Sequence, residues 1–473
     1  MNTRNMFLCL TLVTSGVATA EDWPWFLGPR HDGTSEERLN LAWPEDGPEV
    51  VWKQRVGTGY SAPSIVDGQL VIHHRERDQE KITCRRADNG AEVWNHQYPS
   101  SYVDRYNYNN GPRCSPILAN GRCYTLGAEG SLRCLNLEDG KLIWKRSLQD
   151  DFNIPDWFFG MGCSPVLEDG RLFVLVGGQP NAGVVCFDAD SGQTLWQSVG
   201  RDTWNGQTGS TQTRPYEWTG EEMVVSYASP ILATIHGQRH LLCLVRQGLV
   251  SLDPQSGRKN FHYWFRPKVH ESVNAARPLV IDDRIFLSAA YRLGSTMLQV
   301  SADGKSVKEV WTDARSMLAH WSTPIHVDGF IYGFSGRHRN EGELRCIRAS
   351  DGELIWKESG FNGDLRKFAR NRTTGAIIDA ETGKEVPPPY FGRGSLIQVG
   401  ERFVALGEEG TLAVVKIDSQ KYVEERRSGF PEIKYPAWTA PVVSGGKMYL
   451  RSEDWLLCLN VTATEPAQKS DGE

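Results

Sequence analysis

The residues Cys186–Trp196, with the sequence CFDADSGQTLW, combine side chains that could take part in chemistry. Asp188 and Asp190 have the spacing of the first two ligands in an EF-hand calcium loop, and Cys186 could act as a metal ligand or a nucleophile. An EF-hand loop also needs a glycine at its sixth position and a glutamate at its twelfth, whereas here the glycine is fifth and Val199 is twelfth. We therefore interpret the segment as a tight turn rather than a calcium site.

The other cysteines and histidines form no recognisable catalytic or metal-binding set. Several cysteines occupy the same place in similar stretches of sequence, namely Cys84, Cys134, Cys186 and Cys346. We expect most of the ten cysteines to be small buried residues. The sequence HHRERD at 73–78 could hold a metal, but it lies at the end of a predicted strand, where we expect solvated side chains. No Gly-x-Ser-x-Gly motif occurs, and we assign no catalytic residue and no metal site.

These stretches belong to a repeat that runs along the chain. Each copy has a small residue, a bend that ends in glycine, and a strand that reaches tryptophan. Besides Cys186–Trp196, the copies are CRRADNGAEVW (84–94), CLNLEDGKLIW (134–144), SLDPQSGRKNFHYW (251–264), the looser VSADGKSVKEVW (300–311) and CIRASDGELIW (346–356). A segment that recurs in this way indicates an architecture of repeated units.

A second signature precedes each bend and indicates short antiparallel strands. It has a Ser/Thr-Pro or similar pair, apolar residues, a turn with Gly or Asp and an alternating apolar strand, at 61–74, 114–127, 163–177, 228–244, 276–290, 322–336, 394–407 and 439–452. Asp-Gly and Asn-Gly turns favour tight hairpins because glycine adopts positive φ without steric cost. Four strands form one propeller blade, which cannot bury both faces alone. We therefore predict an all-β fold, an eight-bladed β-propeller of four-stranded antiparallel blades.

The two ends of the chain complete the predicted ring. The last unit, which starts at Pro441, has three predicted strands and ends without its tryptophan strand. The segment EVVWKQRV (49–56) carries Trp52 but has no strands before it, so we predict that it supplies the outer strand of the eighth blade. The ring then closes by joining the N- and C-terminal strands. We assign residues 21–460 to a single propeller and 461–473 to a disordered tail.

Residues 1–20 have the features of a secretory signal peptide. The apolar run Met6–Val13 is too short to span a bilayer, and the small residues Ala18–Ala20 form an A-x-A cleavage site. Cys9 lies inside the apolar run rather than after it, so we expect no lipid anchor. We predict an exported protein, periplasmic or secreted, that is cleaved near Ala20 and has no transmembrane segment. The net charge of −6 indicates no nucleic-acid binding.

The repeat resembles the pyrroloquinoline quinone (PQQ)-type β-propeller family over nearly the whole chain after the leader. Repeats of that family have a small residue, Leu, Asp, two residues, Thr-Gly, three residues and Trp, and Cys186–Trp196 matches this pattern. Arg86, Asn136 and Arg348 stand where the family has Asp, and the seventh unit has no tryptophan. In the family, the tryptophan and the glycine turn dock neighbouring blades. The resemblance assigns this structural role to Trp52, Trp94, Trp144, Trp196, Trp264, Trp311 and Trp356, and to Gly90, Gly140, Gly192, Gly257 and Gly352.

The resemblance implies one of two functions. Quinoprotein alcohol and sugar dehydrogenases of this family bind PQQ and Ca²⁺, and many carry an adjacent cysteine pair or a haem domain. This chain has no adjacent cysteine pair, no Cys-x-x-Cys-His motif and no clear equivalents of the calcium-binding Glu, Asn and Asp. It is more similar to the non-enzymatic branch that includes the outer-membrane assembly factor BamB, although the lipidation cysteine is missing and the loops are longer. We expect no cofactor, and PQQ with Ca²⁺ only under the dehydrogenase alternative.

The central funnel of the predicted propeller is a candidate binding site. The innermost strands of a propeller start around its channel, so the residues three before each proline of the signature should ring one end. This ring and its charged neighbours identify Tyr60, Arg113, Tyr227, Arg277, His320, Trp321, Arg393 and Trp438 as candidate ligand-binding residues, with Gly162 and Ala275 completing the ring. Aromatic and cationic groups around a funnel suit a ligand or a peptide. The alternative is that these side chains only fill or wet the channel.

Four long loops are the other candidate site: 98–113, 150–162, 201–222 and 365–394. We expect them on the same face as the ring, and their Tyr, Trp, Asn and Arg residues are typical of interface hot spots. We therefore hypothesise a monomeric, exported, non-catalytic, BamB-like scaffold that binds a protein partner or an envelope component through this face, in cell-envelope or outer-membrane assembly. The alternative is a PQQ-dependent quinoprotein dehydrogenase of alcohols or sugars. A polysaccharide- or sulfated-glycan-associated factor is a third hypothesis, which rests on the aromatic residues alone.

Overall fold

The third blade shows why one repeat unit folds as it does. Its strands pair antiparallel in chain order: β11 (Val166–Glu168), β12 (Arg171–Gly178), β13 (Ala182–Asp188) and β14 (Thr194–Ser198). Asp169 and Gly170 between β11 and β12 have positive φ angles of 50° and 71°, as a type I′ hairpin turn requires. Nearly every residue of β12 and β13 is buried, so the blade must be covered by a neighbour on each face.

The computed structural model describes residues 21–44, 46–155, 159–209, 213–224, 226–269, 271–338, 341–361, 365–371, 377–386 and 390–461. The predicted leader and nearly all of the predicted tail lie outside these residues. Val461, with which the predicted tail begins, is buried and its N–H donates to the carbonyl of Gly446.

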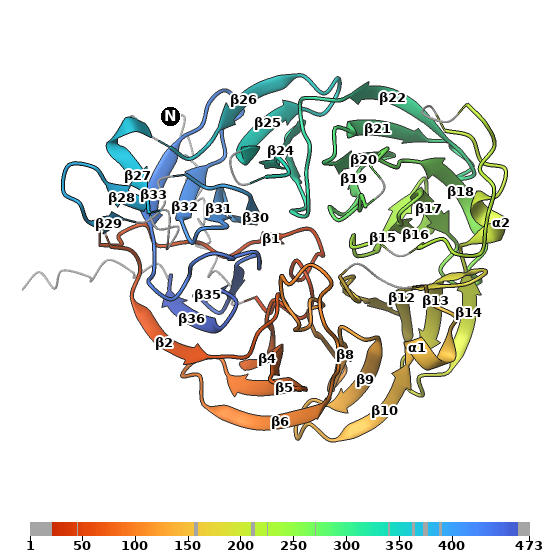
Figure 1. The fold of residues 1–473 in the computed structure, drawn as a ribbon, viewed down its shortest axis with the longest axis horizontal. Coiled ribbons are helices and arrows are strands. Elements are labelled where there is room, and N and C mark those ends of the chain that lie inside the picture. The colour runs from red at the N-terminus through yellow and green to blue at the C-terminus, as the bar shows by residue number, and fades with distance from the viewer. Residues whose placement is uncertain are drawn as a thin grey trace, which may run out of the picture.

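Within the described residues, the strands form eight blades around a central channel, which confirms the predicted fold (Figure 1). The innermost strands are β3 (Ser64–Val66), β7 (Ile117–Ala119), β11, β15 (Ile231–Ile235), β19 (Leu279–Ile281), β23 (Ile325–Val327), β30 (Gly394–Val399) and β34 (Val442–Ser444). The second strands are β4 (Gln69–Glu76), β8 (Arg122–Leu126), β12, β16 (Gln238–Leu244), β20 (Arg284–Ala289), β24 (Phe330–Ser335), β31 (Arg402–Gly407) and β35 (Lys447–Arg451). The third strands are β5 (Gln79–Arg86), β9 (Ser131–Asn136), β13, β17 (Gly248–Leu252), β21 (Gly294–Val300), β25 (Glu343–Arg348), β32 (Leu412–Lys416) and β36 (Trp455–Asn460). The outer strands are β6 (Glu92–Pro99), β10 (Leu142–Ser147), β14, β18 (Lys259–Trp264), β22 (Val307–Asp313), β26 (Leu354–Glu358), β33 (Glu424–Ser428) and β2 (Val50–Arg55).

The N- and C-terminal strands close the ring as predicted. Strand β2 pairs antiparallel with β36, and Trp52 lies opposite Cys458. Short elements are added to the ring: β1 (Thr34–Ser35), α1 (Leu148–Asp151), α2 (Arg201–Trp204), a 3₁₀ turn (Leu365–Lys367), and a small sheet of β27 (Phe368–Arg370), β28 (Ile377–Asp379) and β29 (Glu385–Val386). The small sheet lies at the outer rim, beside β33 (Figure 1).

One contact recurs between neighbouring blades. The indole Nε1–H of an outer-strand tryptophan donates to a backbone carbonyl of the next blade at 2.8–3.1 Å, in the pairs Trp52–Ala87, Trp94–Leu137, Trp144–Ala189, Trp196–Pro254, Trp311–Ala349 and Trp356–Asp418. Five of these indole rings also cover a glycine of the next blade, in the order Gly90, Gly140, Gly192, Gly257 and Gly352. A Cβ on Gly192 would lie 2.8 Å from the Trp144 ring, so no larger residue fits there.

Trp264 does not make this contact, and the docking role assigned to it is wrong. Ser251 pairs with Phe261 across β17 and β18, in the register that the tryptophans have in the other blades. Phe261 therefore occupies the docking position, since Trp264 comes too late in the strand. The Trp264 ring packs instead against Trp204 and Tyr216 of a long loop, at centroid distances of 5.9 and 5.4 Å.

Hydroxyl groups connect the blades at the inner edge. The backbone N–H groups of Ala62, Ser115 and Ser164 donate to the side-chain hydroxyls of Ser115, Ser164 and Ser229 at 3.2, 2.9 and 2.9 Å. Each of these residues directly precedes the proline of its signature. The Ser-Pro pairs therefore link the first four blades in succession around the channel.

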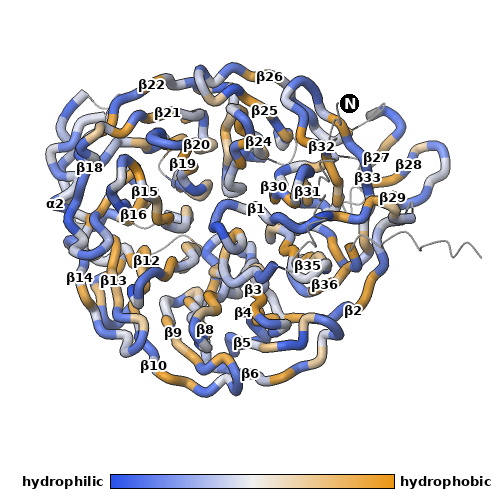
Figure 2. Tube along the Cα trace, turned by 180° about the vertical axis from the view of Figure 1, so that it is seen from behind, coloured by the Kyte–Doolittle hydropathy of each residue, from blue (hydrophilic) through white to orange (hydrophobic). Residues whose placement is uncertain are grey.

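Residues 21–37 form a strap across the end of the channel that lies away from the funnel mouth (Figure 2). Backbone bonds of 2.9 and 2.8 Å join Trp23 to Ile65 of the first blade, and the Pro24 carbonyl accepts from the Leu118 N–H of the second. At its other end, β1 pairs in parallel with β30 of the seventh blade. The strap therefore ties the first and second blades to the seventh.

Replacing the docking glycine Gly192 by alanine should destabilise the propeller more than replacing the hairpin glycine Gly170. Both have φ near +70°, so both alanines carry a backbone strain of about 1 kcal/mol. Only the Gly192 Cβ would collide with a tryptophan, whereas nothing lies within 4 Å of a Cβ at Gly170, so we expect about 2 kcal/mol more from overpacking. Urea unfolding followed by circular dichroism measures both variants; equal losses of stability would contradict the docking role.

Candidate functional site

A cavity of about 380 Å³ occupies the central channel between the loops and the strap. Phe26 and Leu27 of the strap line its inner end. The whole predicted ring lines it as well: Tyr60, Arg113, Gly162, Tyr227, Ala275, Trp321 and Trp438, together with His320 and Arg393. The position three residues before each proline therefore faces the channel in every blade for which it was derived.

Arg277 does not line this cavity, so its predicted place at the funnel is wrong. It directly precedes Pro278, in the position that other blades fill with the serine of the inner hydroxyl contacts. Its side chain is only 3% exposed and donates to the carbonyls of Ser229 and Pro230 at 3.2 and 2.9 Å and to His31 of the strap at 2.6 Å. Arg277 therefore fastens the strap to the fourth and fifth blades.

Arg393 is held at one side of the cavity by a fully buried carboxylate. Its guanidinium bonds both carboxylate oxygens of Glu408 at 2.7–3.1 Å. The same guanidinium lies 4.7 and 5.0 Å from the ring centres of Trp321 and Trp438, and Trp438 Nε1 donates to Glu408 at 2.9 Å. This cluster fixes both indoles, and its charges neutralise each other.

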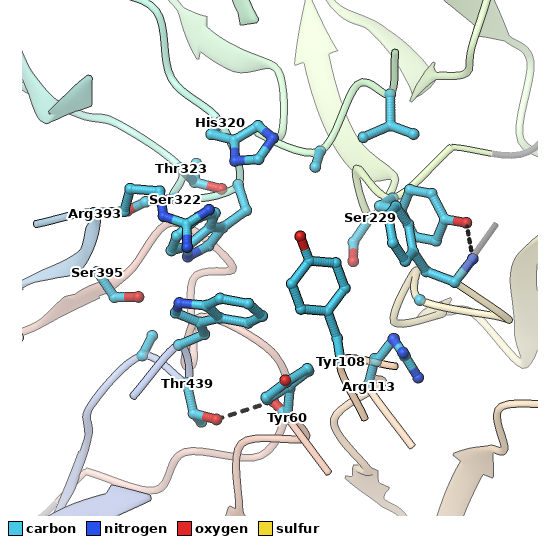
Figure 3. Close-up of a pocket in the computed structure, with 18 of the residues that line it drawn as sticks. Tyr60, Tyr108, Arg113, Ser229, His320, Ser322, Thr323, Arg393, Ser395 and Thr439 are labelled. Atoms are coloured by element: carbon cyan, nitrogen blue, oxygen red, sulfur yellow. Dashed lines mark hydrogen bonds between the residues drawn. The ribbon is translucent and has the colours of Figure 1, made fainter. Parts of the chain in front are cut away.

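The loop 98–113 is fixed at its base and exposed at its tip. Arg113 pairs with the buried Asp104 at 2.5 Å and donates to two carbonyls of the loop at 2.8 and 2.9 Å. At the tip, Tyr106 and Tyr108 are 37% and 49% exposed. Figure 3 shows Tyr108 in the middle of the opening. Tyr106 and Tyr108 at the tip of this loop thus line the cavity with aromatic side chains.

Three buried polar atoms around the cavity have no hydrogen-bond partner among the described residues: Tyr60 Oη, His320 Nδ1 and Trp321 Nε1. Burial lowers the pKa of His320 to about 3, helped by the charge of Arg393, so this imidazole is neutral at physiological pH. Burial also raises the pKa of Tyr60, so its phenol keeps its proton. Unpartnered buried groups are costly unless water or a ligand binds them, so the cavity can offer hydrogen bonds to a guest.

Several cavity residues lie outside the proline register and are not found by it: Tyr108, Phe159, Tyr291 and Arg337. Phe159 donates its N–H to the Tyr227 hydroxyl at 2.9 Å, and the Arg337 guanidinium lies 4.4 Å from the Tyr291 ring centre. The aromatic composition of loops 98–113 and 150–162 was the signal for Tyr108 and Phe159. No repeat position marks Tyr291 or Arg337.

The four long loops do not contribute equally. Loops 98–113 and 150–162 place side chains in the cavity. The described part of loop 201–222 places none there and instead covers Trp264 at the outer strand of the fourth blade. Loop 365–394 contributes Arg393, while β27, β28 and β29 form its separate sheet at the rim. Three of the four loops therefore reach the cavity, and the described part of loop 201–222 does not.

The segment that resembled a calcium loop is a turn. The Ser191 N–H and hydroxyl both donate to one carboxylate oxygen of Asp188, at 2.8 and 2.7 Å. In the described part of the chain, no group of three or more His, Cys, Asp or Glu side chains is arranged to hold a metal ion.

The histidines of HHRERD are buried rather than solvated, contrary to expectation. They lie in the interior strand β4, where both faces of the blade are covered. Tyr98 and His73 contact Glu80, with His73 Nε2 3.1 Å from its carboxylate, and His74 Nδ1 accepts the Gly57 N–H at 2.9 Å. These residues stabilise the first blade and do not face the cavity.

Sequence comparison identifies the family. A profile described as outer membrane protein assembly factor BamB matches residues 78–358. The chain belongs to the BamB-like family of PQQ-type β-propellers. BamB of Yersinia pestis is 23% identical over 169 residues, which cover 35% of this chain and 36% of that protein. BamB of Escherichia coli K12 is 25% identical over 142 residues, 29% and 31% of the two chains, so this BamB-like chain spans about a third of the length of the curated relatives it matches.

Solved structures share the fold of this BamB-like chain. BamB from Moraxella catarrhalis has a TM-score of 0.54 at 12% identity, covering 88% of this chain and 99% of that one. Quinohemoprotein alcohol dehydrogenase from Comamonas testosteroni has a TM-score of 0.60, also at 12% identity, covering 96% and 83%. At these identities the likeness concerns the fold alone. None of the helices described here has the length and apolar character needed to cross a membrane.

The cavity of the BamB-like propeller does not match the needs of PQQ with Ca²⁺. A calcium site needs several oxygen ligands in one place. The two buried carboxylates near the cavity, Asp104 and Glu408, are each bonded to an arginine, and Glu271 lies exposed at the rim.

The thiols of the native protein should not react with a thiol reagent. The nine described cysteines are free and buried, and burial raises the pKa of Cys134 and Cys346 to about 11 and that of Cys84 to about 12. Because the thiolate is the reactive species, we expect a form that begins at Glu21 to show almost no reaction with Ellman's reagent before unfolding and nine equivalents after it. Fewer equivalents in guanidinium would reveal disulfides, and rapid native labelling would contradict the buried positions.

Proposed function

We propose that this BamB-like propeller is an exported, non-catalytic scaffold that binds a protein partner at the mouth of the central cavity. The observation that carries the proposal is the tip of loop 98–113. Val103, Tyr106 and Tyr108 are 68%, 37% and 49% exposed there, on a base fixed by buried polar bonds. Exposed aromatic side chains on a rigid support are the usual anchors of protein interfaces.

Arg75 makes the base of this loop rigid. It is 7% exposed and donates to the carbonyls of Ser100 and Asn110 at 2.8 and 3.0 Å. A cation that bonds several carbonyls of one loop holds its backbone in a single conformation. Less conformational entropy is then lost when the tyrosines bind a partner.

The cavity behind the tip supports the same function. Trp438 and Phe159 contact the Tyr108 ring at centroid distances of 5.7 and 6.0 Å, so the tip continues into an aromatic surface. A partner side chain of suitable shape has a pocket to enter beside Tyr108. The relatives are named as outer-membrane assembly factors, and we place the partner in cell-envelope or outer-membrane assembly on that basis.

A photo-crosslinking side chain at Tyr108 should capture one partner protein in cells that produce this propeller. Val93 on β6 is the matched control, because it is 48% exposed against 49% for Tyr108 but lies on an outer strand. We expect a defined adduct from position 108, identified by mass spectrometry as an envelope protein, and none from position 93. Tyr108→Ser should weaken binding of that partner about tenfold with an unchanged melting temperature.

Equal amounts of adduct from positions 108 and 93, or no adduct from position 108, would contradict the scaffold proposal. The dehydrogenase alternative has a separate readout. Dye reduction by an alcohol or a sugar with added PQQ and Ca²⁺ would show that the protein is an enzyme.

A further inference from the structure

One wall of the cavity carries hydrogen-bond donors that have no acceptor among the described residues. It consists of Tyr291, His320, Trp321 and Arg337, which we call the donor wall. These side chains are contiguous, with the Arg337 guanidinium 4.4 Å from the Tyr291 ring centre and the His320 ring 5.6 Å from Tyr291 and 5.3 Å from Trp321. Among the described residues, Arg337 forms no ion pair with a carboxylate.

The direction of the hydrogen bond between Tyr291 and His320 decides which nitrogen of His320 carries the proton. The Tyr291 hydroxyl lies 3.3 Å from His320 Nε2, and we assign the hydroxyl as the donor of this bond. Because the buried imidazole is neutral, its remaining proton is on Nδ1. Nδ1 has no partner, so it is an unused donor at the cavity.

Trp321 adds a second unused donor. Its Nε1–H is buried without a partner, and an indole N–H cannot accept a hydrogen bond. Arg337 adds a positive charge, whereas Arg113 and Arg393 are already paired with Asp104 and Glu408. Glu271 at the rim is exposed, so water weakens its effect. The wall therefore suits a group that accepts several hydrogen bonds and carries a negative charge.

We propose that the donor wall binds a carboxylate carried by a ring-sized organic group. The carboxylate accepts hydrogen bonds from His320 Nδ1 and Trp321 Nε1 and pairs with Arg337. The organic group packs on Tyr60 and Trp438, whose rings contact each other at a centroid distance of 5.0 Å. The carboxylate comes either from a free acid or from the end of a polypeptide. This inference goes beyond the scaffold function and does not require it.

Calorimetric titration of the purified protein tests both sources of the carboxylate. Benzoate against benzamide represents a free acid, and N-acetylphenylalanine against its amide represents a chain end. In at least one pair we expect the acid to bind about tenfold more tightly than the amide, since charge-assisted hydrogen bonds are the stronger ones. Arg337→Gln should remove most of this preference. Arg55→Gln is the control, because Arg55 lies over Trp455 at 5.0 Å on the outer rim.

Melting temperatures show that both variants are folded. Amides that bind as well as acids, an unchanged preference in R337Q, or the absence of binding in both pairs would each overturn the proposal. None of these outcomes bears on the Tyr108 adduct, so the two ideas fail separately.

A second inference concerns Glu37, and a different observation carries it. Glu37 is 5% exposed, and its two oxygens accept the N–H groups of Gly445 and Gly446 at 2.7 and 2.8 Å and that of Glu21 at 3.1 Å. Among the described residues, no Lys, Arg or His forms an ion pair with it. A buried carboxylate of this kind is costly without a cation.

Glu21 is well placed to supply that cation. Its side chain is fixed by Ser35 Oγ at 3.0 Å, by the Glu36 N–H at 3.1 Å and by Arg30 at 2.8 Å. We infer that cleavage after Ala20 turns the Glu21 amide into an α-ammonium group that pairs with Glu37 and fastens the strap to the eighth blade. This inference rests on the proposed export and processing.

The stability of two recombinant forms tests the pair without export. One form begins at Glu21 with a free amine, and the other is identical but N-terminally acetylated. We expect acetylation to lower the melting temperature by about 2 °C, and Glu37→Gln to abolish that difference. Glu36→Gln is the control, because Glu36 is exposed and should leave the difference intact.

The pair is refuted if acetylation has no effect or acts equally in E37Q. The N-terminal residue of the exported protein, determined by mass spectrometry, tests processing separately.

Discussion

The structure depends on a contact that six of the eight blades make with the next: an indole N–H donating to a backbone carbonyl. A four-stranded blade with two apolar faces is unstable alone, so its neighbours must be placed in a defined register. The indole of Trp144 provides this register, because its Nε1 bonds Ala189 while its ring covers Gly192. The hydrogen bond fixes the orientation of the indole relative to the next blade. The glycine, which has no side chain, sets how closely the two blades approach. Repeated around the ring, this pair of constraints holds the inner strands in the circle that forms the cavity.

Much of the fold could be predicted because its determinants are local and repeated. Tight turns and alternating strands can each be recognised within a few residues of sequence, and counting them predicts the number of blades. Trp52 lies on a strand with no other strands before it, and this predicts the ring closure. Phe261 shows the limit of this reasoning. The sequence suggested Trp264 as the docking residue because it is the tryptophan of that strand. The docking position is instead set by the number of residues after Ser251, and Phe261 occupies it. Interval matters more than residue type, since the strand register places the side chain.

The cavity could be predicted only in part, for a related reason. Tyr60 and Trp438 occupy repeated positions and were found, whereas Tyr291 and Arg337 come from blade-specific loops. The strap was not foreseen, because its bonds to Ile65 and Leu118 join segments with no shared pattern. The prediction for Arg277 was wrong because a positively charged residue was expected to face the funnel. Its position in the repeat is the one that forms the inner hydroxyl contacts in other blades. The repeats thus specify the propeller fold, and residues outside the repeat pattern specify what its cavity can bind.

The strap has a kinetic consequence. Phe26 and Leu27 of the strap line the cavity, and Tyr108 stands in its opening. A partner seated on that opening would block the exit of a guest through it. Binding would then be ordered, with the guest first and the partner second, and the lifetime of the trapped guest would be set by how slowly the partner dissociates.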